Sequence, residues 1–259
     1  MNNSANKVVV ITGASSGIGQ AIALHLANNA FSLVLVARRL DRINALVDQI
    51  IQQGGKAIAV KADVTRQEEV QRAIDAAVDA YQRVDVLINN VGGTIWTKPY
   101  DQYGEQEIEK EIRRSLFPTL WCCRAVLPFM VKKKKGTIVN VSSIATRSIH
   151  RVPYAAAKGG VNALTASIAM EQARNGIRIN ATAPGGTEAP PRRIPRNQAQ
   201  PTEQEQAWYQ GVIDQTIDSS LMHRYGTIDE QVAPILFLAS DESSYITGSI
   251  VPVGGGDLG

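Results

Sequence analysis

The sequence has 259 residues, enough for one large domain or two small ones with a sizeable core. Hydrophobic residues make up 44% and charged residues 20%, the values of an ordinary globular protein. A net charge of +3, with basic and acidic residues interspersed, gives no signature of nucleic-acid binding. The one basic cluster, Lys132–Lys135, is interpreted as the solvated end of a helix.

The sequence indicates no membrane span, secretion signal or metal site. The N-terminal residues lack the apolar core of a signal peptide, and no apolar run approaches the roughly 18–20 residues of a membrane span. Cys122 and Cys123 are adjacent in a predicted helix and point apart, so we expect no disulfide. The three histidines are scattered, without metal-ligand spacing. We expect a cytoplasmic protein with no metal and no membrane or nucleic-acid partner.

Short β-branched runs alternate with longer segments of helical period. The pattern predicts strands at Lys7–Thr12, Ser32–Val36, Ala57–Val60, Val84–Ile88, Thr137–Val141, Arg178–Ala181 and Ile250–Val253. It predicts helices at Gly17–Asn29, Leu40–Gln53, Glu68–Tyr81, Glu107–Lys132, Pro153–Asn175, Thr202–Met222 (one or two helices) and Asp229–Ser240, with Pro118 and Pro128 as irregularities. The β-α alternation predicts an α/β fold, a Rossmann-type doubly wound parallel sheet with right-handed crossovers.

The alternation breaks after Pro184, where residues 185–201 are rich in Pro, Arg and Gln. A long excursion near the carboxyl end of a sheet commonly forms a lid over a substrate. No shift in composition marks a second domain. We therefore expect a single domain over residues 1–259, with a helical substrate lid at about 185–222.

A glycine-rich turn, Thr12–Gly19, joins the first predicted strand to the first predicted helix. Its glycines allow a tight turn and close backbone approach, and the helix N-terminus attracts a pyrophosphate. The turn predicts a dinucleotide-binding site that includes Gly13, Ser15, Ser16, Gly17 and Gly19.

The second strand is followed by Ala37-Arg38-Arg39. A carboxylate at this place usually binds a free ribose 2′-hydroxyl, whereas an arginine suits a 2′-phosphate. Ala37 removes the acid and Arg38 offers a guanidinium, so we predict a preference for NADP(H). The alternative is that Arg38 and Arg39 are solvated residues at the start of a helix.

Polar residues also follow the third and fourth strands, at the same edge of the sheet. Asp63, followed by Val64, can accept a hydrogen bond from an adenine amine. Asn89 and Asn90 either border the dinucleotide or satisfy local turn amides.

Tyr154 and Lys158 lie four residues apart in a predicted helix, so both side chains project from one face. A phenol has a reference pKa of roughly 10, and a fixed ammonium nearby favours the phenolate and lowers that pKa. The pair therefore predicts a general acid/base. Ser143 precedes the pair, eleven residues before Tyr154.

These motifs occur in the order typical of the short-chain dehydrogenase/reductase superfamily, and the resemblance covers essentially the whole chain: Thr12-Gly13-Ala14-Ser15-Ser16-Gly17-Ile18-Gly19, Asn89-Asn90-Val91-Gly92, the set Ser143, Tyr154 and Lys158, and Pro184-Gly185. The resemblance implies that Tyr154 is the acid/base, that Lys158 binds the nicotinamide ribose and lowers the tyrosine pKa, and that Ser143 stabilises the reacting oxygen. It also implies cofactor contacts from Ile18, Val91 and Thr187. The predicted cofactor site thus comprises Gly13, Ser15, Ser16, Gly17, Ile18, Gly19, Arg38, Arg39, Asp63, Val64, Asn90, Val91, Gly92, Tyr154, Lys158, Pro184, Gly185 and Thr187.

One position departs from this superfamily. Many members carry an Asn on the fourth helix that helps to hold a water in the proton relay, and Ser115 stands where that Asn is expected. We include Ser115 in the predicted catalytic set, as a residue that could orient the water.

Longer stretches resemble the benzoate cis-diol dehydrogenases: residues 92–96, 113–124, 183–197 and 254–259. That resemblance implies oxidation of 1,6-dihydroxycyclohexa-2,4-diene-1-carboxylate to catechol and CO2, in benzoate degradation, with NAD(H) as the alternative cofactor. The competing hypotheses are an NADPH-dependent carbonyl or 3-oxoacyl thioester reductase, which Arg38 favours, and a non-enzymatic dinucleotide sensor. Superfamily resemblance also implies a homotetramer or homodimer.

A carboxylate substrate requires a cationic anchor, and guanidinium groups pair with carboxylates through two hydrogen bonds. Several arginines fall in loops predicted near the site. The candidate substrate residues are Arg147, Arg151, Arg192 and Arg193, with Arg196 in the same segment as the last two. The alternative is that most of them are solvated or support the lid.

Overall fold

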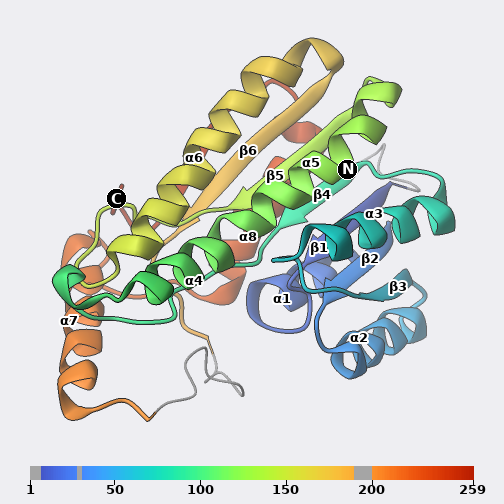
Figure 1. The fold of residues 1–259 in the computed structure, drawn as a ribbon. Coiled ribbons are helices and arrows are strands. Elements are labelled where there is room, and N and C mark those ends of the chain that lie inside the picture. Colours follow the sequence, from blue (N-terminus) through green and yellow to red (C-terminus); the bar gives the residue numbers. More distant parts are fainter. Residues whose placement is uncertain (1–6, 28–30, 190–199) are drawn as a thin grey trace.

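Seven strands form one parallel sheet in the order β3-β2-β1-β4-β5-β6-β7 (Figure 1). The computed structural model describes residues 7–27, 31–189 and 200–259. The strands are β1 (Val8–Thr12), β2 (Ser32–Ala37), β3 (Lys56–Lys61), β4 (Val86–Asn89), β5 (Gly136–Val141), β6 (Ile177–Pro184) and β7 (Ile250–Val253). The predicted α/β fold with a doubly wound parallel sheet is confirmed.

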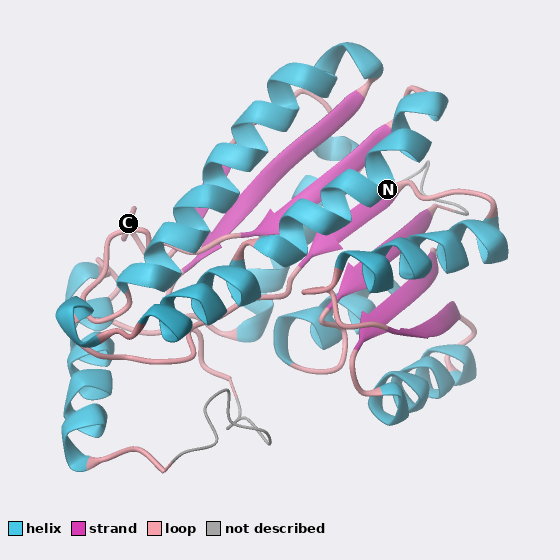
Figure 2. Cartoon of the chain, in the orientation of Figure 1, coloured by secondary structure: helices cyan, strands magenta, loops and turns pink. Residues whose placement is uncertain are grey.

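Helices surround this sheet (Figure 2). They are α1 (Gly17–Ala27), α2 (Leu40–Gln52), α3 (Gln67–Tyr81), α4 (Glu105–Ser115), α5 (Phe117–Lys133), α6 (Val152–Gln172), α7 (Glu203–Ser219) and α8 (Ile228–Ala239). Short 3-10 turns are found at η1 (Tyr100–Gln102), η2 (Ala173–Asn175) and η3 (Asp241–Ser243). Within the described ranges, no helix has the length and apolar character needed to cross a bilayer.

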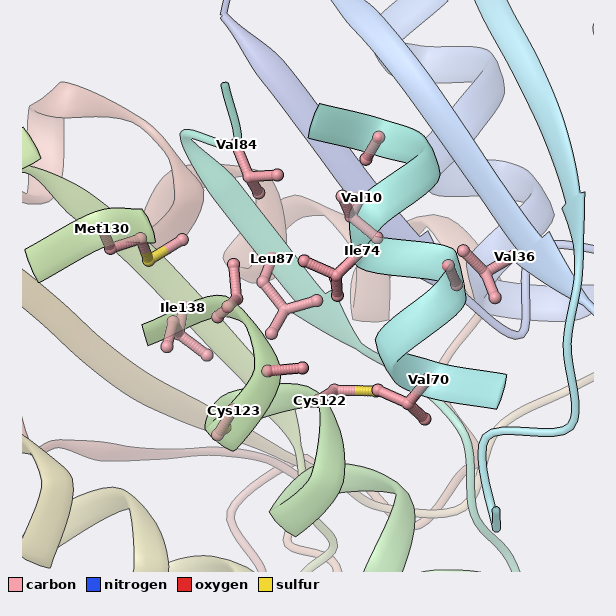
Figure 3. Packing of buried hydrophobic residues seen from close by; sticks show 14 of the residues in the cluster. Val10, Val36, Val70, Ile74, Val84, Leu87, Cys122, Cys123, Met130 and Ile138 are labelled. Atoms are coloured by element: carbon pink, nitrogen blue, oxygen red, sulfur yellow. The ribbon is translucent and has the colours of Figure 1, made fainter. Parts of the chain in front are cut away.

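Alternate residues of the central strands enter two separate cores. On β1, Val8 and Val10 join a cluster with α3, α5 and α6 (Figure 3), whereas Val9 and Ile11 join a cluster with α1, α2 and α8. Every residue of β1 is consequently buried. Strands covered on both faces are apolar throughout, which explains the continuous apolar run in the sequence.

The strand order reverses at β1, which pairs with β2 on one side and with β4 on the other. In an open parallel sheet, the loops that leave such a reversal point run to opposite faces and leave a crevice at the carboxyl edge. The glycine-rich turn after β1 and the Asn89–Asn90 pair at the end of β4 meet at this edge. The topology therefore places the predicted dinucleotide residues together.

The single helix predicted over Glu107–Lys132 is wrong, because α4 ends at Ser115 and α5 begins at Phe117. Pro118 lies in the first turn of α5, where its missing N–H removes no helical bond. In a continuous helix its ring would clash with the carbonyl of the residue four positions earlier. A new turn begins instead at Leu116, whose carbonyl accepts from Thr119 N at 3.1 Å. Pro128 lies inside α5 without ending it.

The segment predicted as one or two helices over 202–222 contains one helix, α7. A reciprocal capping box starts it: Glu205 N donates to Thr202 Oγ1 at 3.2 Å, and Thr202 N donates to Glu205 Oε2 at 2.8 Å. The helix lies beside the loop before α6 (Figure 1), where the rings of His150 and Trp208 are 6.3 Å apart.

Candidate functional site

The glycine-rich turn has the backbone that a phosphate-binding turn requires. Gly13 and Gly17 have φ angles of +67° and +56°, in the left-handed region that favours glycine. A Cβ on Gly19 would overlap the carbonyl oxygen of Gly13 and the side chain of Asn90. A Cβ on Gly17, at the start of α1, would meet nothing within 4 Å. The helix N-terminus thus faces open space, a cradle that fits a pyrophosphate.

Asn90 ties the end of β4 to this turn. Its side-chain amide donates to the carbonyls of Thr12 at 3.3 Å and Gly13 at 3.4 Å, and its backbone N–H donates to Thr12 Oγ1 at 3.0 Å. The Val91 side chain lies against Gly13 as well. The contacts of Asn90 match the alternative in which it satisfies local backbone groups, and they also hold the turn in position. Ser15, Ser16 and Ile18 lie in the same turn, with Ser16 exposed.

Arg38 and Asp63 lie at the carboxyl ends of the neighbouring strands β2 and β3, which pair up to Ala37 and Lys61. Arg38 is exposed, and Arg39 occupies the N-cap position of α2 without a capping hydrogen bond from its side chain. Asp63 Oδ1 accepts from the backbone N–H of Thr65 at 3.0 Å and from its hydroxyl at 2.8 Å. Val64 is buried in the core. The edge next to the glycine-rich turn therefore presents an arginine and a turn-bound carboxylate.

Tyr154 and Lys158 lie in the first turns of α6, and they are 9% and 3% exposed. Lys158 Nζ is 5.9 Å from the centre of the Tyr154 ring and donates to the carbonyl of Val141 at 2.6 Å. Burial lowers the pKa of Lys158 to about 8. An ammonium held in this way can act on the phenol at neutral pH.

Ser143 follows the end of β5 and is buried next to β6. Its Oγ accepts from the backbone N–H of Ala145 at 3.1 Å and donates to the carbonyl of Pro184 at 3.4 Å. Pro184 ends β6, and Gly185 continues it by donating to the carbonyl of Val253 at 2.9 Å. The structure thus brings Ser143 to the predicted Pro184-Gly185 motif.

Thr187 lies just beyond this motif and bridges to Gly226. Its hydroxyl donates to the carbonyl of Gly185 at 3.2 Å. The turn after β6 is therefore tied to Gly226, in the segment between α7 and α8.

Gly92 packs directly against the Lys158 side chain, because a Cβ there would lie 2.9 Å from Lys158 Nζ and 3.8 Å from Ser115 Cα. Ser115 is fully buried, and its Oγ accepts from the backbone N–H of Gly93 at 3.2 Å. Ser115 and Lys158 thus both lie against Gly92, and the hydroxyl of Ser115 is engaged by the backbone.

A cleft opens beside Ser143 and contains two of the predicted substrate arginines. Arg147 is exposed at this cleft, and Arg151 is half-buried in it. Arg192 and Arg193, like Arg196, lie outside the described residues. The cleft is lined by Ser143, Ile144, Ala145, Arg147, Ser148, Arg151, Pro184, Gly185, Gly186, Gln215, Thr216, Tyr225 and Asp257.

Arg151 is the best-defined cation of this cleft. Its Nε and Nη2 donate to Ser148 Oγ at 3.0 and 2.7 Å, and Ser148 Oγ lies 3.4 Å from Gln215 Oε1 of α7. Burial lowers the pKa of Arg151, while the neighbouring phenols Tyr154 and Tyr225 act in the opposite direction. Among the described residues, no carboxylate forms a salt bridge with it.

Eight of the thirteen cleft residues were not predicted, among them Gln215, Tyr225 and Asp257. Gln215 comes from α7, Tyr225 from the segment after it and Asp257 from the last residues. Asp257 lies in the stretch 254–259 that resembles the benzoate cis-diol dehydrogenases, whereas no motif marks Gln215 or Tyr225. A Cβ on Gly186 would overlap the Tyr225 ring, so this tyrosine packs flat on the backbone after β6. Only the helical periodicity of α7 could have suggested Gln215 from the sequence. Within the described ranges, no three His, Cys, Asp or Glu side chains gather as metal ligands.

Two relatives match nearly the whole chain. A 1,6-dihydroxycyclohexa-2,4-diene-1-carboxylate dehydrogenase of Acinetobacter baylyi is 59% identical over 254 residues, covering 98% of this chain and 97% of the relative. A protein of the same name from Pseudomonas putida is 58% identical over 253 residues, covering 98% of this chain and 93% of the relative.

A solved structure supports the same family. NAD+-bound xylitol dehydrogenase superposes with a TM-score of 0.85 at 27% identity, over 98% of this chain and 100% of that chain. The profile of the family described as short chain dehydrogenase matches residues 7–200. This protein therefore belongs to the short-chain dehydrogenase family and is an NAD(P)(H)-dependent oxidoreductase.

Proposed function

We propose that this protein oxidises 1,6-dihydroxycyclohexa-2,4-diene-1-carboxylate, or a ring-substituted relative, to catechol and CO2. The observation that carries this proposal is the 58–59% identity, over 98% of the chain, to two relatives named as dehydrogenases of that compound. The arginine-containing cleft beside Ser143 supports it, because the substrate is both an alcohol and a carboxylate.

The chemistry consists of an oxidation followed by loss of CO2. The secondary hydroxyl loses its proton to Tyr154, and NAD(P)+, when bound, accepts the hydride from the same carbon. The product is a β-keto acid, in which the bond to the carboxyl group breaks readily because its electrons move into the new carbonyl. CO2 leaves and the ring becomes aromatic as catechol, so one diol acid gives one catechol, one CO2 and one reduced cofactor.

Three side chains of this protein supply the proton chemistry in our proposal. Tyr154 is the general base, and Lys158 favours its phenolate because a nearby positive charge stabilises the anion. Ser143 hydrogen-bonds the reacting oxygen. Support comes from the burial of all three residues at the carboxyl edge of the sheet. Ser115, close to Lys158 through Gly92, is kept as a proposed relay residue.

We propose Arg151 as the carboxylate anchor. A guanidinium has five N–H donors in a planar fork, so the contact with Ser148 leaves donors for a second acceptor. Half-burial of this cation costs free energy, and a bound carboxylate would offset that cost. Arg147 is the second candidate, at an exposed position of the same cleft. Arg192 and Arg193 remain candidates from the sequence alone.

We propose NADP(H) as the preferred cofactor and NAD(H) as the alternative. The glycine-rich turn would hold the pyrophosphate, and Asp63 and Val64, which follow β3, would contact the adenine. Arg38, with Arg39 beside it, would pair with a 2′-phosphate, since it is exposed at the end of β2. Thr187 and Gly185 would contact the nicotinamide end. Comparing kcat/KM for NADP+ and NAD+ tests this choice, and a clear NAD+ preference would contradict it.

The substrate proposal is tested by mixing the purified protein with benzoate cis-diol and each oxidised cofactor. We expect a rise in absorbance from reduced cofactor, together with catechol in the product mixture. Turnover of simple secondary alcohols without turnover of the diol acid would overturn the proposal.

A second candidate is an NADPH-dependent carbonyl or 3-oxoacyl thioester reductase, which the exposed Arg38 favours. A reductase of this kind requires no carboxylate anchor in the cleft. It would oxidise NADPH rapidly with a 3-oxoacyl thioester, whereas our proposal predicts little activity with that substrate.

We further propose that the protein acts in the cytoplasm as a homotetramer or homodimer. Light scattering of the purified protein measures the assembly, and a monomer at micromolar concentration would contradict it.

A further inference from the structure

Glu111 is a buried carboxyl that the proposed chemistry does not use. It lies on α4 and is 0% exposed, although Glu105 and Glu109 of the same helix are exposed. Burying a carboxyl costs free energy unless hydrogen bonds replace the lost water. The contacts of Glu111 therefore indicate what its burial achieves.

Glu111 holds the loop that follows β4. Its Oε1 accepts from the backbone N–H of Ile95 at 2.6 Å and of Trp96 at 2.9 Å. Ser115, one helical turn later on the same face, accepts from the backbone N–H of Gly93 at 3.2 Å. One face of α4 thus fixes three backbone amides of the segment 93–96.

Gly92, which directly precedes this segment and forms its inner end, lies against the proton-transfer residue Lys158. A Cβ on Gly92 would lie 2.9 Å from Lys158 Nζ, so the backbone at Gly92 packs directly on the lysine side chain. Any displacement of the loop would change the space around Lys158.

The outer end of the segment reaches the loop that carries Arg151. The Tyr103 hydroxyl donates to the carbonyl of Trp96 at 2.8 Å and lies 3.1 Å from the carbonyl of His150. Lys98 N also donates to the carbonyl of His150, at 2.9 Å. His150, which has a φ of +57°, directly precedes Arg151. Because Tyr103 contacts the carbonyls of both Trp96 and His150, a shift at Trp96 would move the backbone next to Arg151.

We infer that Glu111 is a positioning residue that fixes Lys158 and Arg151 relative to each other, and thereby places the substrate's reacting hydroxyl relative to its carboxylate. This inference rests on the proposed function, because only a substrate with both groups needs that distance. Near-attack geometry is sensitive to displacements of about 1 Å, which can cost about a hundredfold in rate.

Two substitutions of Glu111 distinguish the effect of its hydrogen bonds from the effect of its side-chain volume. Glu111→Gln keeps an acceptor oxygen where Oε1 is and removes the carboxylate charge. Glu111→Met fills a similar volume without an acceptor. Glu109→Met, at an exposed position of the same helix, is the matched control.

We expect Glu111→Met to lower kcat about tenfold and to raise KM for benzoate cis-diol about tenfold, since both ends of the segment are released. Glu111→Gln is expected to stay within about threefold of the wild type, and Glu109→Met to match it. Amide hydrogen exchange should become faster at both 92–97 and 147–152 in Glu111→Met only. Tyr103→Phe removes the hydroxyl contacts of the outer link, leaves the Lys98 contact with His150 and does not touch the inner end, so it should raise KM without changing kcat, even if Glu111→Met does not fold.

Wild-type kinetic constants in Glu111→Met would overturn the inference, as would equal losses in the Gln and Met variants. Faster exchange at 92–97 with no change at 147–152 would refute the link to Arg151. If the wild-type protein does not oxidise the diol acid, the proposed function fails, and the exchange data still decide whether Glu111 couples the two loops.

Discussion

At the scale of single residues, Arg151 is the proposed anchor for the substrate carboxylate. Replacing it with Ala removes a partly buried charged partner, a change that costs on the order of 2 kcal/mol or more in binding. We therefore expect KM for benzoate cis-diol to rise about 30-fold or more. KM for a cis-dihydrodiol without a carboxyl group should change little. Steady-state kinetics with both substrates, and with Arg147→Ala as a comparison, measure this, and equal effects on the two substrates would count against the anchor.

Lys158 makes the stability of the cofactor-free protein depend on pH. Its pKa in the folded protein is about 8, below its usual value, because burial disfavours the ammonium. The unfolded chain then binds more protons between about pH 8 and 10.5, so this group makes folding more favourable as pH rises through that window. The gain is on the order of 3 kcal/mol at most. Chemical denaturation from pH 7 to 10 should show this rise in the wild type and not in Lys158→Met; parallel curves would contradict it.

At the scale of elements, the core that joins α3 and α5 to the sheet carries the stability. Leu87 of β4 is completely buried between these helices (Figure 3), whereas Ile51 of α2 is 53% exposed. Leu87→Ala should lower the free energy of unfolding by about 2–5 kcal/mol, because it removes buried apolar surface and leaves a cavity. Ile51→Ala should cost less than about 1 kcal/mol. Urea denaturation compares the two variants, and similar losses in both would show that this core is not the stabilising element.

The strands and the glycine-rich turn could be predicted from the sequence because local patterns determine them. Buried strands are continuous apolar runs, and a phosphate turn needs glycines at fixed places, as at Gly13 and Gly17. The separation of α4 from α5 was missed, although Pro118 indicated an irregularity. The break between the helices depends on how Leu116 packs against Gly160 of α6, which helical period alone does not report.

At the scale of the whole molecule, the site combines residues from distant parts of the chain. Ser143, Tyr154 and Lys158 could be predicted as catalytic residues from the sequence because they lie close together along it. Gln215 of α7 and Tyr225 of the segment after it line the same cleft, and Glu111 contacts the loop after β4 that leads toward it. Such residues carry no local signal, because tertiary packing alone brings them to the site. Glu111 in particular stands among other glutamates on α4 and is distinguished only by its burial.

The central claim is that the site around Tyr154 converts a diol acid to catechol with one equivalent of reduced cofactor. The most direct test quantifies catechol by chromatography and reduced cofactor by absorbance in the same reaction, for the wild type and for Tyr154→Phe. We predict a one-to-one ratio for the wild type. In Tyr154→Phe we predict a loss of about a hundredfold or more in turnover, with cofactor binding retained. Reduced cofactor without catechol, or unchanged turnover in Tyr154→Phe, would contradict the claim.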